Sequence, residues 1–292
     1  APDAAWSSAQ GLEAFVPGAG EPELDGLVAH RSLLAALAQK GFKAAVTRDV
    51  AQRASVTVSL NLEDALRTSY LGLPATSVKL PTGSPFSPFA NAVTGYRFID
   101  APGALSRESD TLRTQLAMAA NGRLGAWRWT VTGDFDRTVS DTTTGRGVDA
   151  SAFQAAVAAG DASVNPFGVI PVSLYKTVAA DTAHSVSTSA SAELVLNGTV
   201  FEGPAGPVQS TFKLGLDTRG LDSKTVRSGV TTTREVTRDR QSFQGNFNLP
   251  LTSTRQGFLA KAGDLSANFN FGYEELSDLG GLTTLGGGLS WA

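Results

Sequence analysis

Asp134 and Asp136 are the residues whose type and spacing come nearest to a chemical site. They stand two positions apart, so both carboxylates project from the same face of a β-strand. Two carboxylates on one face could act as a general acid and a general base. The alternative is a pair of surface charges that are solvated or interact with Arg128 and with residues of neighbouring strands. We favour this alternative, because the sequence holds no further catalytic signature.

The rest of the sequence holds no catalytic or metal-binding pattern. His30 and His184 are the only histidines, they stand far apart, and neither belongs to an HExxH or paired-ligand spacing. No GxSxG nucleophile elbow or Walker loop occurs. The run from Gly286 to Gly288 lacks the GxGxxG spacing, and Asn197-Gly198-Thr199, although a glycosylation sequon, is first a turn signal. We therefore predict a protein that is not an enzyme, with no catalytic residue, metal or cofactor.

The two aspartates belong to a long alternating segment, Gly125 to Thr138. From Trp127 to Asp136 its odd positions are apolar or glycine and its even positions are polar, which predicts a strand with one apolar and one charged face. The alternation is about as long as a tilted strand that crosses a bilayer, roughly 9–11 residues. A strand of a soluble sandwich has the same pattern, so the other strands must decide between the two.

Composition excludes several classes of protein. The chain has 292 residues, 17% charged residues, a net charge of −3 and no cysteine. It holds no disulfide framework and no apolar run of about 18 residues that would make a helical membrane span. The near-neutral charge gives no argument for a nucleic-acid partner. The chain opens at Ala1 without a methionine or a signal peptide, so we expect it to be a processed piece of a longer protein.

The hydrophobic periodicity divides the chain into two regions. Residues 1–40 are predicted to be a loop region with a short helix over Leu27 to Lys40, and residues 41–292 a partial β-barrel. Two long irregular stretches, Ala65 to Glu108 and Val139 to Thr182, separate the strands, and the second should contain a short helix between Asp149 and Gly160. About nine strands are expected, centred on Phe42–Val46, Val56–Leu62, Leu112–Ala120, Trp127–Phe135, Val186–Leu196, Val208–Leu216, Phe243–Leu251, Leu265–Tyr273 and Leu285–Trp291.

Within the strand centres the charged residues keep to the parity opposite the large apolar residues. An Arg or Lys on the lipid face at mid-membrane would cost about 2–4 kcal/mol, which is enough to enforce this rule. Connections also alternate, generally short on one side and long on the other, as in outer-membrane barrels. We therefore predict that Arg113, Arg128, Asp134, Asp136, Glu193, Lys213 and Glu274 line a lumen. Trp127, Trp129 and Trp291 are predicted to be interface aromatics, the alternative being sugar stacking.

Several segments carry a resemblance to a known family. GAWRWTVTGDFDR, the SPFSPF and NPFG loops, AELVLNG and GDLSANFNFGYEELSDLGGLTTLGGGLSW resemble the barrel segment of TonB-dependent outer-membrane receptors. The resemblance implies part of a barrel of about 22 strands in the bacterial outer membrane, contacting lipid. It further implies energised uptake of a siderophore, cobalamin or oligosaccharide-class ligand through the TonB complex. The plug domain, which would contact TonB, and the remaining strands are absent from this sequence.

The predicted fold is therefore all-β, an antiparallel meander of long amphipathic strands that forms part of a transmembrane barrel, with long external loops containing short helices. The alternatives are a porin or autotransporter barrel without energy coupling and a soluble β-rich carbohydrate-binding module. Leu60, Trp129, Phe212, Phe247 and Phe269 should share the convex outer face, and Arg128, Lys213, Asn246 and Asn268 the concave face. Both outermost strands should have free edges, so the chain alone should form an open curved sheet and not a soluble monomer.

Overall fold

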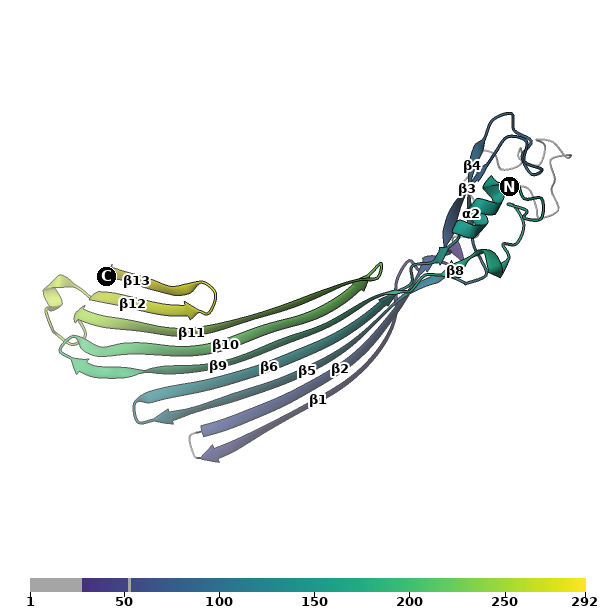
Figure 1. The fold of residues 1–292 in the computed structure, drawn as a ribbon. Helices are drawn as coiled ribbons and strands as arrows, with labels where there is room; N and C mark the ends of the chain where they lie inside the picture. The colour runs from purple at the N-terminus through teal and green to yellow at the C-terminus, as the bar shows by residue number, and fades with distance from the viewer. Residues whose placement is uncertain (1–27, 52–53) are drawn as a thin grey trace.

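The computed structural model of the chain describes residues 28–51 and 54–292, and in them nine long strands form one antiparallel sheet (Figure 1). Each strand pairs with the strand before and after it in the order β1-β2-β5-β6-β9-β10-β11-β12-β13, which confirms the predicted meander. The strands are β1 Ala36–Ala51, β2 Ala54–Gly72, β5 Leu105–Leu124, β6 Trp127–Thr144, β9 Asp181–Gly203, β10 Gly206–Arg227, β11 Val230–Thr252, β12 Leu265–Leu276 and β13 Gly280–Trp291.

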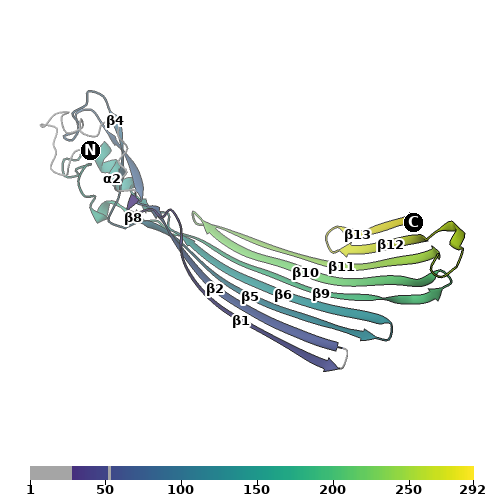
Figure 2. The same ribbon diagram turned by 180° about the vertical axis from the view of Figure 1, so that it is seen from behind.

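The sheet is open and curved, as Figures 1 and 2 show from opposite sides. Among the described residues β1 pairs only with β2, and β13 pairs only with β12, so the nine strands do not close on one another. The antiparallel all-β fold is as predicted. The closed transmembrane barrel is not part of the observed fold.

Cross-strand pairing assigns every strand residue to one of two faces, because residues directly opposite each other share a face. One row runs Gly122, Trp129, Leu196, Phe212, Gly245 and Phe271 across β5 to β12. The next row on the other face runs Asn121, Thr130, Val195, Lys213 and Gln244. We call these the apolar face and the polar face. The residues predicted to share a face do so on each side.

The strands extend further than the sequence predicted. β2 continues to Gly72 and β6 to Thr144, so residues 65–72 and 139–144 are strand, where irregular loops were expected. β10 and β11 continue through the polar segment Arg219 to Arg240, which the sequence allowed to prolong both strands, to a tight turn at Ser228 and Gly229, both with positive φ. These extensions are rich in polar residues and show little alternation, and they are ordered by pairing with their neighbours.

The helix predicted over Leu27 to Lys40 is wrong beyond its first turn, because Val28 is helical and residues 31–40 are not. Ala36 to Lys40 form the start of β1, where Lys40 lies opposite Asp64 of β2. Leu27 itself and the preceding loop region lie outside the described residues. Leucines at helical spacing are a weak signal in a segment that can extend a sheet, because pairing overrides local propensity.

The two long connections, residues 73–104 and 145–180, fold together into a small unit beyond one end of the sheet, which we call the head (Figure 1). It contains the hairpin β3 Ala75–Leu80 and β4 Val93–Phe98, helix α2 Ser151–Ala158, the 3-10 helix η3 Val172–Leu174, and the short pair β7 Val148–Asp149 and β8 Lys176–Thr177. Phe153 of α2 is fully buried against Val78, Leu80 and Ile99 of the hairpin unit. The short helix predicted between Asp149 and Gly160 is confirmed.

The connections follow the predicted alternation only in the first half of the sheet. At the end away from the head, the turns after β5 and β9 are tight, and those after β2 and β6 at the head end are long. The second half reverses this pattern, because β11 and β12 are joined at the far end by residues 253–264, including η4 Ala260–Ala262, and β12 turns tightly into β13 at the head end.

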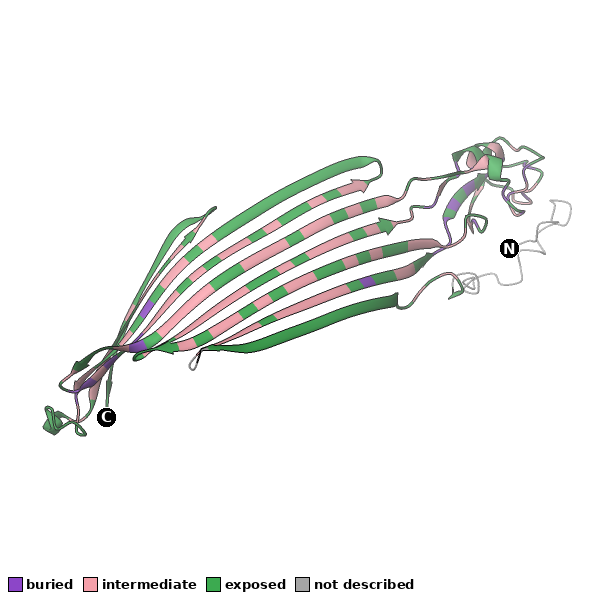
Figure 3. Cartoon of the chain, turned by 90° about the horizontal axis from the view of Figure 1, so that it is seen from below, coloured by how far each residue is buried: buried purple, intermediate pink, exposed green. Residues whose placement is uncertain are grey.

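Burial is concentrated in the head and not in the sheet (Figure 3). The sheet is one layer thick, and no described element packs across either face. Large side chains of the apolar face are therefore open to the surroundings: Leu216 is 58% exposed and Leu289 is 73% exposed. The molecule thus combines a small buried core with a wide uncovered apolar surface.

Candidate functional site

The seven charged residues predicted to line a lumen all lie on the polar face. Asp134 lies opposite Ser191, and Ser191 opposite Asp217, so these positions share one row of that face. Because side chains alternate along a strand, Asp136 and Arg128 lie on the same face as Asp134. The pairing places the rest there as well: Arg113, Glu193, Lys213 and Glu274.

Two ion pairs on this face join predicted residues across neighbouring strands. The Nη2 atom of Arg113 lies 2.7 Å from Oδ2 of Asp136, and Thr138 donates a hydrogen bond to the other carboxylate oxygen. The Nζ atom of Lys213 lies 2.7 Å from Oε2 of Glu193. The partly exposed position of both pairs limits their contribution to about 0.2–1 kcal/mol each. Their main effect is to fix the arrangement of charge.

The sequence interpretation placed Arg128 near the two aspartates. In the structure it lies far from them. It stands six residues before Asp134 on the same strand, a separation of about 20 Å, and lies opposite Asn197. Its place is taken by Arg113 of the preceding strand. Asp134 has no ion-pair partner within the described part of the chain, and Asp136 is held by Arg113. The two carboxylates therefore form no shared acid–base pair.

A third cluster on the polar face joins the predicted residue Glu274 to three residues that were not predicted, Asp217, Arg219 and Arg240. Arg240 of β11 contacts Oδ2 of Asp217 at 2.5 Å, and its Nη1 atom lies 3.8 Å from the carboxylate of Glu274. Arg219 approaches the other oxygen of Asp217 at 3.8 Å. The sequence could have indicated that Asp217 lies on the polar face, because it falls on the parity opposite Leu214 and Leu216. Only the register shows that Arg240 lies directly opposite.

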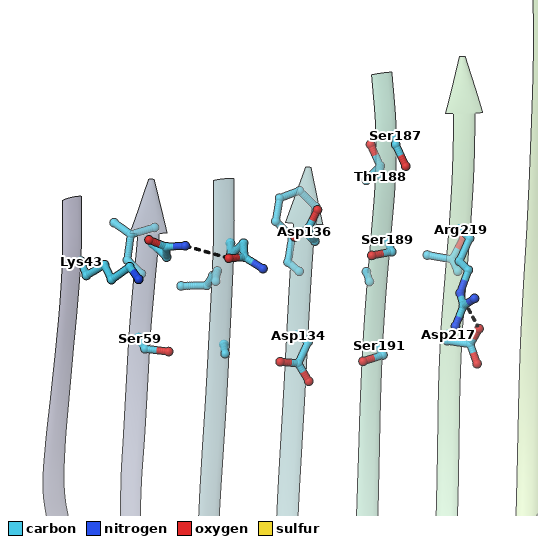
Figure 4. A pocket seen from close by; sticks show the side chains of 18 of the residues that line it. Lys43, Ser59, Asp134, Asp136, Ser187, Thr188, Ser189, Ser191, Asp217 and Arg219 are labelled. Atoms are coloured by element: carbon cyan, nitrogen blue, oxygen red, sulfur yellow. Dashed lines mark hydrogen bonds and ion pairs between the residues drawn. The ribbon is translucent and has the colours of Figure 1, made fainter. Parts of the chain in front are cut away.

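A hollow of about 850 Å³ lies beside Asp134, Asp136 and Asp217. Figure 4 shows Asp134, Asp136, Asp217 and Arg219 projecting from neighbouring strands around it. Its remaining polar lining consists of side chains on β1, β2, β5 and β9: Lys43, Ser59, Asn61, Gln115, Ser187, Ser189 and Ser191. A hollow of this kind can hold water, ions or a hydroxylated solute. It contains no histidine and no cysteine.

His184 lies on the other side of the sheet from the hollow. Its Nδ1 atom is 2.7 Å from Oδ1 of Asp141 on the neighbouring strand, and both side chains are more than half exposed. Within the described residues no three His, Cys, Asp or Glu side chains gather in a way that would hold a metal ion. His30 stands near the start of the described chain, where its carbonyl accepts a hydrogen bond from the backbone of Gly72.

The predicted interface tryptophans lie at the end of the sheet away from the head. Trp127 and Trp129 are on the apolar face, and each ring covers a glycine of a neighbouring strand, Gly198 and Gly122 respectively. An added Cβ at Gly198 would lie 2.6 Å from the Trp127 ring. Trp291 ends β13, where its Nε1 donates to the Ala262 carbonyl at 2.7 Å.

An aromatic chain continues from Trp127 across the same face. Its ring centroid lies 6.1 Å from that of Phe212, which in turn meets Phe243 and Phe247 at 6.5 and 5.4 Å. Phe271 of β12 extends the chain, 5.3 Å from Phe243. Offset and edge contacts at such distances are favourable for aromatic pairs. The apolar face therefore has an aromatic zone at the end far from the head.

The head has a hollow of its own, about 420 Å³, beside Arg97 and Asp100 of the hairpin unit and Phe167 of the NPFG segment. Arg97 donates a hydrogen bond to the Pro166 carbonyl, and burial lowers the pKa of its guanidinium. The two long connections are thus joined by a polar contact as well as by the apolar core. The head can present a shaped surface to a ligand.

No protein-family model matches the chain, and no curated protein matches it. Within residues 28–51 and 54–292, no helix has the length and hydrophobicity needed to cross a membrane.

Proposed function

We propose that the chain forms part of the wall of a β-barrel in the bacterial outer membrane, of the TonB-dependent receptor type. In this proposal the apolar face contacts lipid and the polar face lines the lumen. The complete receptor takes up a scarce small ligand, of the siderophore, cobalamin or oligosaccharide class, with energy from the TonB complex. The head takes part in ligand capture.

The observation that carries the proposal is the oblique course of the apolar band. Moving toward the head on the apolar face, the continuous apolar band of each strand ends at a first polar residue: Lys40, Asp64, Thr114, Arg137, Thr188, Thr218, Gln241, Glu275 and Thr283. Single apolar residues, Leu66, Leu112, Val139 and Val186, follow beyond it on four of the strands. Lys40 and Asp64 are directly opposite each other. Thr283 lies in the same row as Val56 of β2, which is eight residues further from the head than Asp64. The boundary therefore shifts by about eight residues over eight steps between strands.

This shift corresponds to a definite strand tilt. A strand rises about 3.4 Å per residue and lies about 4.8 Å from its neighbour. If the apolar band is flat, a boundary shift of one residue per strand-to-strand step means that the strands are inclined by about 35° to the normal of the band. Strands of membrane barrels tilt by about 35–45°. A soluble sheet that buries one face against a second layer has no reason to keep such a flat boundary.

The aromatic zone supports the same orientation. Trp127, Phe247 and Trp291 lie at or near the lower limit of the apolar band, away from the head. Tryptophan and other aromatic side chains favour the level of the lipid headgroups. The head would then stand outside the membrane on the opposite side, where the long loops of such barrels lie. A carbohydrate-binding module would instead need a covering for the apolar face, and no described residue supplies one.

Quenching of tryptophan fluorescence by brominated lipids tests this orientation. The full chain would be inserted into phosphatidylcholine vesicles whose acyl chains carry bromine either near the headgroup or near the bilayer centre. We expect stronger quenching by the shallow bromines, and a reduced difference in a Trp127→Phe, Trp129→Phe double variant. Equal quenching by both lipids, or none, would contradict the membrane orientation. A porin or autotransporter barrel would give the same result, and is separated from a receptor by the absence of a plug domain encoded upstream.

A further inference from the structure

The two faces of the sheet carry opposite charge at the head end. On the polar face, between the large hollow and the head, stand Arg67, Arg107, Arg227 and Arg234. At the same height most charged side chains of the apolar face are carboxylates: Asp64, Glu108, Asp110, Asp141, Asp222, Glu235 and Asp239. An approaching anion is therefore attracted to one face and repelled from the other.

These arginines are not engaged elsewhere. Arg67, Arg227 and Arg234 are exposed, and in the described part of the chain they form no ion pair or side-chain hydrogen bond. Arg107 donates only to the hydroxyl of Thr144. The carboxylates nearby already have cationic partners: Asp136 pairs with Arg113, Asp181 with Arg146 and Asp278 with Arg238. Glu63 is the unpaired carboxylate that remains on this part of the polar face in the described strands.

A floor of hydroxyl groups lies between the two arginine pairs. Arg67 and Arg107 flank it from β2 and β5, and Arg227 and Arg234 from β10 and β11. The floor is made of Ser109, Thr111, Thr138, Ser140, Thr142, Ser185, Ser187, Ser223 and Thr225, which the pairing places on the polar face. Hydroxyls both donate and accept, so they can turn donors toward an anion or bind hydroxyls of a ligand.

The spacing sets the size of the ligand. β5 and β10 are three strand-to-strand steps apart, about 14 Å. The long arginine side chains can extend inward over the hydroxyl floor. Arginines on the two sides could therefore bind two anionic groups of one ligand that are a few Å to about 14 Å apart. The guanidinium fork suits carboxylate and phosphate oxygens, which it can bind through two parallel hydrogen bonds.

We propose that the head end of the polar face binds a small molecule carrying two or more carboxylate or phosphate groups. The arginines on either side hold its anionic groups, and the hydroxyl floor contacts the part between them. That this molecule is a transported ligand rests on the proposed function. Its binding to the polar face does not, because binding requires no membrane orientation.

Titration calorimetry on the full chain in a non-ionic detergent tests the proposal with tripolyphosphate and citrate as probes. We expect at least one of them to bind, and binding to weaken as salt is raised. Arg67→Gln combined with Arg234→Gln should weaken binding about tenfold, since each exposed arginine contributes about two- to fivefold. Binding of one probe alone identifies phosphate or carboxylate as the preferred group.

A matched variant removes the same charge from the opposite face. Arg137→Gln combined with Lys224→Gln leaves the polar face intact and should change binding by less than about twofold. Equal weakening in both double variants would show a response to net charge alone and would overturn the proposal. So would the absence of binding by either probe to the unaltered chain. Neither result bears on the quenching experiment, so the two proposals fail independently.

Discussion

Replacing Leu214 by Arg tests whether the apolar face of the sheet contacts lipid or water. Leu214 lies in the middle of the apolar face, opposite Leu194 on β9 and Phe243 on β11, and is 46% exposed. In a bilayer an arginine at this depth costs about 2–4 kcal/mol. On a surface that contacts water, a substitution at a half-exposed position usually changes stability by about 0.5 kcal/mol or less. The two environments therefore differ by a factor of about ten to several hundred in the unfolding equilibrium.

Gln244→Arg is the control, because it introduces the same side chain on the polar face one residue from Phe243. The measurement is urea-induced unfolding of the full chain from phosphatidylcholine vesicles, followed by tryptophan fluorescence. We expect Leu214→Arg to be destabilised by at least about 2 kcal/mol relative to Gln244→Arg. If either variant does not insert, the protease-protected fraction gives the same ranking. Equal stability, or a larger loss in Gln244→Arg, would refute the assignment of faces.

Three further predictions concern packing and helix capping. Gly198→Ala should destabilise the sheet by about 1–3 kcal/mol because the added methyl group meets the Trp127 ring, whereas Gly133→Ala, with no atom nearer than 3.8 Å, should have little effect in the same unfolding assay. Phe153→Ala should cost about 3–5 kcal/mol and expose the head to proteolysis while the circular dichroism of the sheet is retained. The Asp149 carboxylate accepts the Ser151 N–H, which lowers its pKa. It therefore stabilises the start of α2 above its ordinary pKa of about 3.9, and amide exchange of wild type and Asp149→Ala should converge as the pH falls through the lowered value.

Much of the sheet could be predicted from strand centres with an unbroken alternation. Val56 to Leu62 and Trp127 to Phe135 have one apolar and one polar face, and this pattern is incompatible with a helix. Short turns between such segments predict antiparallel neighbours. The order of the strands and the face of each charged residue followed from these two rules, without any knowledge of register.

The parts that could not be predicted are those in which tertiary pairing decides. Ala36 to Lys40 has leucines nearby at helical spacing, yet it pairs with residues 64–68 of β2. Residues 139–144 are mostly hydroxylated and charged, so neither period is visible there. The hairpin in the head is a different case: Thr76, Val78 and Leu80 do alternate with exposed residues, but six residues between prolines and glycines were too short to be separated from loop.

The candidate site depends on register, which the sequence leaves open. Arg113 and Asp136 are 23 residues apart, and Asp217 and Arg240 are also separated by 23. A shift of two residues between the strands of either pair would keep every side chain on its face and yet break that ion pair, because it would move the partners by about 7 Å. Alternation thus determines which charges share a face, whereas pairing determines which of them are neutralised. The arginines left free at the head end become apparent only after the paired ones are identified, and it is this remainder that gives the polar face its attraction for anions.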